Sequence, residues 1–158
     1  MKFSTTDISS EASGGRYRID TERGLRVEEY QGKVGLEDLR TMVTTMSSDP
    51  CWSPDLHGLV DFCNAELEMS SNDVLRLALT LRQEVNRSRG WLVFAVNSSV
   101  AYGIVRMLGY WSRNTDRFRI FQSRQDAERW LERHREQVPQ GFVEPAAVRT
   151  APPIRGVG

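Results

Sequence analysis

The stretch GWLVFAVNSSVAYGIVRMLG, residues 90–109, decides the fold class. Its first seven residues carry no charge and are bounded by Gly90 and Asn97, which is typical of a strand buried on both faces of a sheet. From Val100 to Leu108 the apolar residues recur three and four positions apart, which predicts an amphipathic helix. A buried strand followed directly by a helix favours an α/β fold.

Polar and small residues mark both ends of this predicted helix. Asn97 or Ser98 is predicted to cap its start, because such side chains accept hydrogen bonds from unpaired backbone N–H groups. Gly109 is predicted to end it as a residue in the left-handed conformation.

The flanking segments repeat this alternation of strand and helix. Segments 16–20 and 25–31 flank the turn residues Glu22-Arg23-Gly24, which indicates an antiparallel hairpin. Further strands are predicted at 57–62 and 117–121, and further helices over 36–46, 74–85 and 123–135, the last capped by Ser123. The order β-β-α-β-α-β-α-β-α predicts a mixed sheet of about five strands, largely parallel after the hairpin, with about four helices.

Length and composition indicate one soluble domain. The chain has 158 residues, with 21 basic and 21 acidic side chains, so its net charge is zero. Nucleic acids and anionic membranes select a concentrated positive surface, so neither is an expected partner. The domain is predicted to span residues 16–136, with a flexible arm at 1–15 and a flexible Pro/Gly-containing tail at 137–158.

Targeting and membrane signals are also missing from the chain. No uncharged apolar run approaches the roughly 18 residues that a membrane span requires, and the first residues lack the apolar core of a signal peptide. A cytoplasmic location is therefore expected.

Two units of the chain resemble a known family. LVDFCNAELEMSSNDVLRLA (59–78) is similar to a strand, a loop and an Asp-Ser-Ser-Gly helix start in the STAS domain, the anti-sigma factor antagonist family with the SpoIIAA-like fold. WLVFAVNSSVAYGIVRMLGYWSRNTDRFRIFQSRQDAERWL (91–131) resembles the strand, capped helix, charged strand and C-terminal helix that follow there. The chain looks closest to the divergent STAS/SEC14-like branch.

The resemblance implies a regulatory role for a pair of serines. Ser70 matches the serine that is phosphorylated in the family, and Ser71 matches its neighbour, so these are the phosphorylation candidates. In a classical member, an anti-sigma-kinase-like protein would be the partner. Met69 and Asn72 stand where the family has an acidic residue and a glycine. From the residues alone, the favoured interpretation of both serines is that they cap the helix.

A second polar helix start follows the buried strand at 90–96. Ligands of open α/β sheets bind beyond the carboxyl ends of parallel strands, so both serine-bearing loops are expected along a single rim. The predicted partner- or ligand-binding residues on this rim are Glu66, Glu68, Asn72, Asp73, Asn97, Ser98 and Ser99.

No pattern in the chain indicates catalysis. The chain has no GxSxG elbow, no P-loop and no dinucleotide-binding glycine pattern. Cys51, His57 and Cys63 lack the paired spacing of a structural zinc site. No catalytic residue, metal or cofactor is therefore expected.

Three functions follow from these observations. The first is a non-enzymatic module that binds a protein partner through residues 66–82. The second is a carrier of a small molecule or lipid, with an apolar pocket lined by side chains such as Met69, Met107 and Trp111. The third is a self-associating domain in which Trp52 and Trp111 form an apolar patch that pairs two copies as a homodimer.

Overall fold

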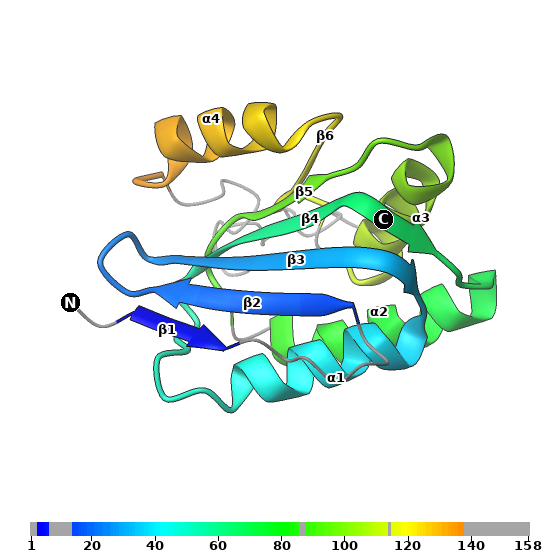
Figure 1. The fold of residues 1–158 in the computed structure, drawn as a ribbon, viewed down its shortest axis with the longest axis horizontal. Coiled ribbons are helices and arrows are strands. Elements are labelled where there is room, and N and C mark those ends of the chain that lie inside the picture. Colours follow the sequence, from blue (N-terminus) through cyan, green and yellow to red (C-terminus); the bar gives the residue numbers. More distant parts are fainter. Residues whose placement is uncertain (1–2, 7–13, 86–87, 114, 138–158) are drawn as a thin grey trace, which may run out of the picture.

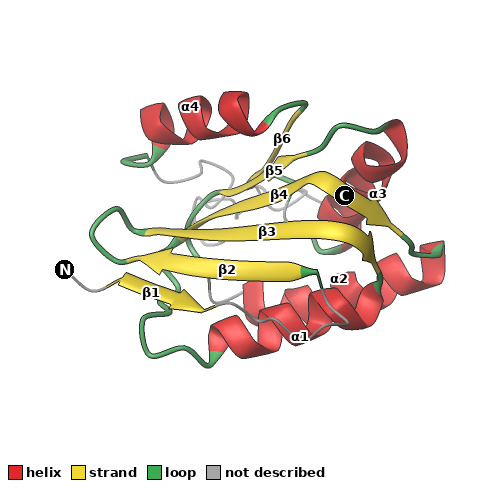
Figure 2. Ribbon diagram, in the orientation of Figure 1, coloured by secondary structure: helices red, strands yellow, loops and turns green. Residues whose placement is uncertain are grey.

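The computed structural model describes residues 3–6, 14–85, 88–113 and 115–137. Figure 1 shows one sheet with helices on both of its faces, and Figure 2 shows the same view coloured by secondary structure. In chain order the elements are β1 (Phe3–Thr6), β2 (Gly15–Asp20), β3 (Leu25–Val34), α1 (Leu36–Ser47), β4 (His57–Leu67), α2 (Ser71–Val85), β5 (Leu92–Ala95), α3 (Ser99–Trp111), β6 (Phe118–Phe121) and α4 (Arg124–His134).

The sheet is mixed, as predicted. Its strands lie in the order β1-β2-β3-β4-β5-β6. The pairs β1/β2 and β2/β3 are antiparallel, and the later pairs are parallel. The α/β class, the antiparallel hairpin, the parallel strands after it and the four helices are therefore confirmed.

The sheet has six strands rather than about five. The extra strand, β1, falls within the predicted arm at 1–15 and pairs with β2 from Phe3 opposite Asp20 to Thr6 opposite Tyr17. Its sequence FSTT has one apolar residue, so no apolar period indicates a strand. The free backbone N–H and C=O groups along the edge of β2 supply the pairing instead. Residues 7–13 of the arm and 138–158 of the tail lie outside the described residues.

Two apolar cores lie on opposite faces of the sheet. The larger core joins the sheet to α1, α2 and α3, and the smaller core joins the other face to α4. Strand alternation assigns the residues, since Val60, Phe62 and Phe94 belong to the larger core while Leu59 and Val93 belong to the smaller.

The carboxyl-end half of β3 and β4 extends beyond the other strands. Their register shifts between Glu29 and Gln31, and the pairing then continues to Val34 and Leu67. Figure 1 shows both strands curving toward the α1 and α2 layer at this end. The curve places the start of α2 at the carboxyl edge of the sheet.

The predicted caps at Ser98 and Ser123 are confirmed. The Oγ atoms of Ser98 and Ser123 each accept a hydrogen bond of 3.1 Å, from Ala101 N and Asp126 N respectively. Gly109, however, does not end α3, which continues to Trp111.

The glycine at 109 is needed for close packing between helix and strand. A Cβ atom there would lie 2.9 Å from the ring of Phe118 on β6. The left-handed residue that follows the helix is Arg113, with φ of 59°. No described helix has the length and apolar character needed to cross a membrane.

Candidate functional site

The predicted serine pair lies at the start of α2, where Ser70 caps the helix. Ser70 Oγ accepts a hydrogen bond from Asp73 N, and Asp73 Oδ2 accepts one from Ser70 N, each at 3.1 Å. This reciprocal pair is a capping box, which satisfies two backbone N–H groups at the helix start. Ser71 is the first helical residue, and both serines are exposed. The capping interpretation is confirmed for Ser70, and phosphorylation remains a prediction.

The two polar loops open at the same edge of the sheet. They follow β4 and β5, which are neighbouring parallel strands. Asn97 Nδ2 donates a hydrogen bond to Cys63 O, so the loop after β5 is tied directly to β4. Because β4 continues past Cys63 to Leu67, Ser70 lies farther along this edge than Ser98.

The other predicted rim residues are solvent-accessible. Glu66, Glu68, Asn72 and Ser99 are exposed, and Asp73 is half-buried because it belongs to the capping box. Glu68 lies 3.6 Å from the Lys33 ammonium group, which is also exposed. A binding role for these residues remains a prediction.

Large exposed apolar side chains gather on two neighbouring helices. Among the residues whose burial is described (14–82, 88–113 and 115–137), the large hydrophobic side chains that are exposed all lie on α2 and α3, with exposed fractions between 39% and 72%. We call this set the apolar helix face, and it consists of Leu75, Leu79, Val100, Tyr102 and Tyr110.

The two helices that form the apolar helix face lie side by side. Arg82 Nε donates a hydrogen bond of 2.9 Å to Trp111 O, which joins their C-terminal ends. Leu75 and Leu79 are one helical turn apart, so they form a continuous ridge on α2. On α3, Val100 and Tyr102 are two positions apart and lie on roughly opposite sides of the helix, so the set spans both helices without forming one continuous ridge.

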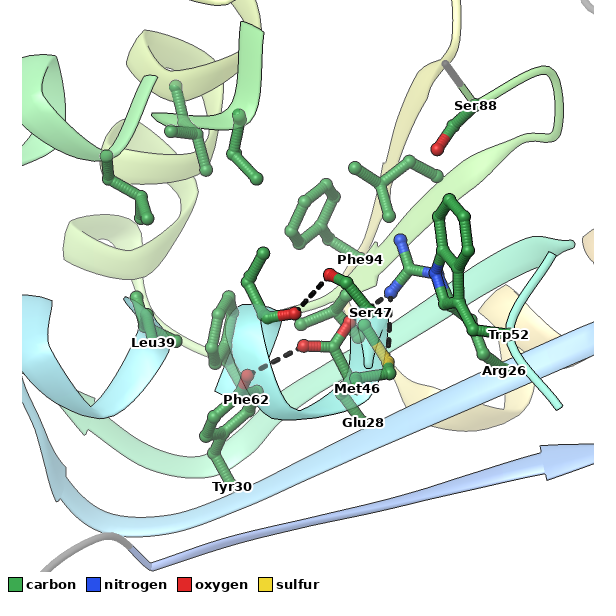
Figure 3. Close-up of a pocket in the computed structure, with 16 residues that line it drawn as sticks. Arg26, Glu28, Tyr30, Leu39, Met46, Ser47, Trp52, Phe62, Ser88 and Phe94 are labelled. Atoms are coloured by element: carbon green, nitrogen blue, oxygen red, sulfur yellow. Dashed lines mark hydrogen bonds and ion pairs between the residues drawn. The ribbon is translucent and has the colours of Figure 1, made fainter. Parts of the chain in front are cut away.

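A cavity lies beneath these helices, between them and the sheet. Its volume is about 70 Å³. Figure 3 shows side chains from β3, α1 and neighbouring elements converging on it. Its lining is Arg26, Glu28, Tyr30, Leu39, Val43, Met46, Ser47, Trp52, Val60, Phe62, Leu77, Leu81, Ser88, Leu92, Phe94 and Leu108.

Three alternate residues of β3 bring polar groups into this apolar space. Arg26 Nη1 forms an ion pair with Glu28 Oε2, and Tyr30 Oη donates a hydrogen bond of 2.7 Å to Glu28 Oε1 (Figure 3). Burial, followed by the charge of Glu28, raises the pKa of Tyr30, so the phenol keeps its proton. Gly58 on β4 makes room for the guanidinium, because a Cβ atom there would lie 2.8 Å from Arg26 Cζ.

This polar cluster is not predicted by the sequence pattern. The segment LRVEEY was interpreted as a hairpin strand, and such a strand needs only one buried face. The layer of α1, α2 and α3 covers one face of β3, and Arg26, Glu28 and Tyr30 all lie on that face. The signal was present, since strand alternation puts the three residues on one face, and burying that face buries its charges.

The pocket predicted from the sequence has different walls. Met69, Met107 and Trp111 do not line the cavity, and they pack instead against the larger core as half-buried residues. Trp52 is also half-buried and lines the cavity. Trp52 and Trp111 both pack inward, so they do not form the exposed apolar patch that the sequence predicts. The exposed large apolar side chains are those of the apolar helix face.

The thiol and imidazole groups have structural partners. His57 Nδ1 accepts a hydrogen bond of 2.9 Å from Trp91 N, and His57 Nε2 lies 2.6 Å from Arg135 O. Burial raises the pKa of Cys63 to about 11, and Asp61 adds to the rise, so this thiol stays protonated at neutral pH. Within the described ranges, no three His, Cys, Asp or Glu side chains are grouped so that they could hold a metal ion.

Comparison with solved structures supplies a likeness for the whole architecture. An uncharacterized protein of the DUF3478 family with a SpoIIAA-like fold, from Shewanella loihica PV-4, superposes with a TM-score of 0.52 and 20% sequence identity. The match covers 79% of this chain and 99% of that chain. The chain has a SpoIIAA-like fold. Searches against models of protein families and against curated proteins give no match.

The elements of the candidate site lie on one face of the sheet. In this chain the layer of α1, α2 and α3 carries the serine cap, the apolar helix face and the cavity, while α4 packs on the other face. At this level of identity the likeness defines the fold, and the function is argued from the site itself.

Proposed function

We propose that the protein is a non-enzymatic binding module, and that it recognises a protein partner through the apolar helix face on α2 and α3. One observation supports this proposal above the others. Among the residues whose burial is described, the exposed large hydrophobic side chains are confined to these two adjacent helices, and Leu75 and Leu79 form a ridge on one of them. Exposed apolar side chains that gather in one place mark protein interfaces, whereas scattered ones have no such meaning.

The composition of the face agrees with that of an interface centre. Tyr102 and Tyr110 supply large rings with a polar end, and tyrosine is enriched among residues that dominate binding energies. Arg106 lies over the Tyr102 ring, with Cζ 5.8 Å from the ring centroid. The partner therefore needs an apolar surface that can enclose Leu75 and Leu79.

The partner is best identified by photo-crosslinking from the face itself. Benzoylphenylalanine placed at Leu79 is expected to give one discrete adduct in the native cells. The matched control is the same residue at Arg133, an exposed position on α4, which is expected to give none. Adducts from Arg133 alone would contradict the proposal, and an adduct of Leu79 with a second copy of the chain would replace a foreign partner by self-association.

Ser70 is proposed as the switch of this interaction. A phosphate adds nearly two negative charges, and the start of α2 would stabilise it through the helix dipole. It would also stand beside the Asp73 carboxylate, which is bonded to Ser70 N. The partner would then meet a strongly anionic end of α2 next to the apolar helix face.

The switch has its own test. Ser70→Asp is expected to weaken binding of the crosslinked partner at least tenfold. Gln125→Asp, an exposed position in the first turn of α4 on the opposite face, is the matched control and should leave binding unchanged. Full binding by Ser70→Asp, together with unmodified Ser70 and Ser71 in the mass spectrum of native protein, would remove the switch and leave the module.

A second candidate function is binding of a small amphipathic molecule in the cavity. The observation that favours it is the Arg26 and Glu28 pair, which presents charge to walls that are largely apolar. Ligand pockets commonly have about 300–1,000 Å³, so the cavity of about 70 Å³ would admit only a few heavy atoms without movement of α1 or α2.

Native mass spectrometry tests this second function. Protein purified from its own cells is expected to carry one small adduct. Val43→Phe, which fills the cavity from α1, should remove the adduct, while Thr44→Phe at the next and exposed position should not. A spectrum with the bare protein mass alone would contradict ligand carriage.

A further inference from the structure

A second concave site lies on the opposite face of the sheet, between α4 and the outer surface of β2 and β3. Its volume is about 310 Å³. We call it the basic groove. It is separated from the apolar helix face and from the cavity by the full thickness of the sheet (Figure 1). No proposal made above for the α1, α2 and α3 layer involves it.

The groove exists because α4 covers only part of this face. α4 packs on β4, β5 and β6, and Figure 1 shows the outer face of β2 and β3 beside it without a helix. Strand alternation turns Tyr17 and Ile19 of β2 into the larger core, so Arg18 between them faces the groove side.

The floor of the groove is apolar. Val27 of β3, Leu59 of β4 and Leu131 of α4 are buried residues of the smaller core, and Leu25 is half-buried against them. These side chains offer an apolar surface to one side of an occupant. A fully polar ion or a sugar would leave that surface without a partner.

The rim of the groove is positively charged. Four arginines line it, at positions 18, 23, 129 and 135, together with Glu128 and Glu132. Both carboxylates are already paired. Glu132 lies 3.4 Å from Arg23 and 3.6 Å from Arg135, and Glu128 lies 2.7 Å from Arg124.

Two arginines remain without such a partner. The side chains of Arg18 and Arg129 form no ion pair or hydrogen bond with any of the described residues, and both are exposed. His57 adds no charge, because it is held by Trp91 N and Arg135 O, and burial lowers its pKa. The groove therefore has an excess of positive charge above an apolar floor.

We propose that the basic groove binds a small amphipathic anion, with an apolar body on the floor and a carboxylate, sulfonate or phosphate group between Arg18 and Arg129. A guanidinium binds such oxyanions through paired N–H donors, which makes arginine the fitting residue at this rim. The volume limits the occupant, since about 310 Å³ is at the lower end of the range for ligand pockets. An aromatic acid of about two or three rings or a short-chain acid fits this space, and a two-chain lipid does not.

The test uses a probe of this chemical class and a matched uncharged probe. The anion is 8-anilinonaphthalene-1-sulfonate, and the control is N-phenyl-1-naphthylamine, which has the same rings without the sulfonate. Fluorescence titration of the full chain is expected to show one anion site whose affinity falls as ionic strength rises. The uncharged probe should bind at least tenfold more weakly.

Variants locate the site. Arg18→Gln/Arg129→Gln removes the two unpaired charges from exposed positions, so the fold is retained, and it should weaken the sulfonate probe at least tenfold. Arg76→Gln/Arg106→Gln removes two exposed charges from α2 and α3, on the opposite face, and should leave binding unchanged.

Two results would overturn the proposal. One is equal affinity for the sulfonate in the Arg18→Gln/Arg129→Gln variant and the unmodified chain. The other is a loss in the Arg76→Gln/Arg106→Gln variant as large as in the groove variant, because the probe would then lie on the apolar helix face. Urea unfolding of both variants is recorded as a folding control. A cooperative transition like that of the unmodified chain shows that a loss of binding is not caused by unfolding.

Discussion

The buried pair of Arg26 and Glu28 gives the most quantitative prediction. The exposed fractions of the two side chains are 15% and 5%, so removing either partner leaves a charge in an apolar surrounding. Breaking a pair buried to this degree costs about 3–5 kcal/mol. We expect Glu28→Met and Arg26→Met each to lower the free energy of unfolding by about this amount, and the melting temperature by about 6–20 °C.

The double variant separates the pair from the rest of the core. Arg26→Met/Glu28→Met removes both charges and replaces them with apolar volume, which is often neutral or stabilising. The Tyr30 hydroxyl loses its acceptor, at a cost of about 1–3 kcal/mol. The double variant is therefore expected to be more stable than the sum of the single effects predicts, by at least about 2 kcal/mol.

The assay is urea unfolding followed by tryptophan fluorescence for all members of the cycle. The matched control is the same cycle at Glu37 and Arg40 on α1, where the ion pair is 3.3 Å long and the side chains are 82% and 43% exposed. Its coupling should not exceed about 0.5 kcal/mol. Equal coupling in the two cycles would refute the account of a desolvated pair in the cavity.

Three further predictions concern single positions. His57 has a pKa lowered by burial, so the folded chain binds fewer protons than the unfolded chain below about pH 6.5. The stability that neutral His57 contributes is complete above that pH and is lost as the pH falls through the folded pKa. Urea unfolding between pH 5 and 8 should show a free energy of unfolding that decreases as the pH falls. His57→Gln should flatten this dependence. Gly109→Ala adds helix propensity but drives Cβ toward the Phe118 ring, so we expect a net loss of about 1 kcal/mol, recovered in Gly109→Ala/Phe118→Leu; a gain from Gly109→Ala alone would contradict the packing argument. Ser98→Ala should cost about 1 kcal/mol in thermal unfolding, and Ser99→Ala, beside it, a few tenths at most; equal effects would deny the cap its role.

The order of the elements was predictable from the sequence because local apolar periodicity specifies it. The uncharged run before Asn97 forms strand β5, which pairs with a strand on each side. The apolar residues spaced from Val100 to Leu108 include the buried stripe of α3. Strand β1 was not predictable in this way. Its pairing depends on the free edge of β2, which lies outside its own sequence.

In the candidate site, too, the local features were predictable from the sequence and those that depend on tertiary packing were not. The caps at Ser70 and Ser98 were predictable because each bond closes within three residues of the cap. The polar cluster around Glu28 and the unpaired charge of Arg18 depend on which helix covers which face of the sheet. Only the assembled layers show that one group is buried and that the other lines a groove.

The central claim, that a protein partner covers α2 and α3, is tested most directly by hydrogen–deuterium exchange of the complex with the crosslinked partner. Backbone amides in α2 and α3 are predicted to gain protection on binding, most of all around Leu75, Leu79 and Tyr102. Those of α4 should exchange as in the free chain. Protection confined to α4, with α2 and α3 unchanged, would contradict the claim.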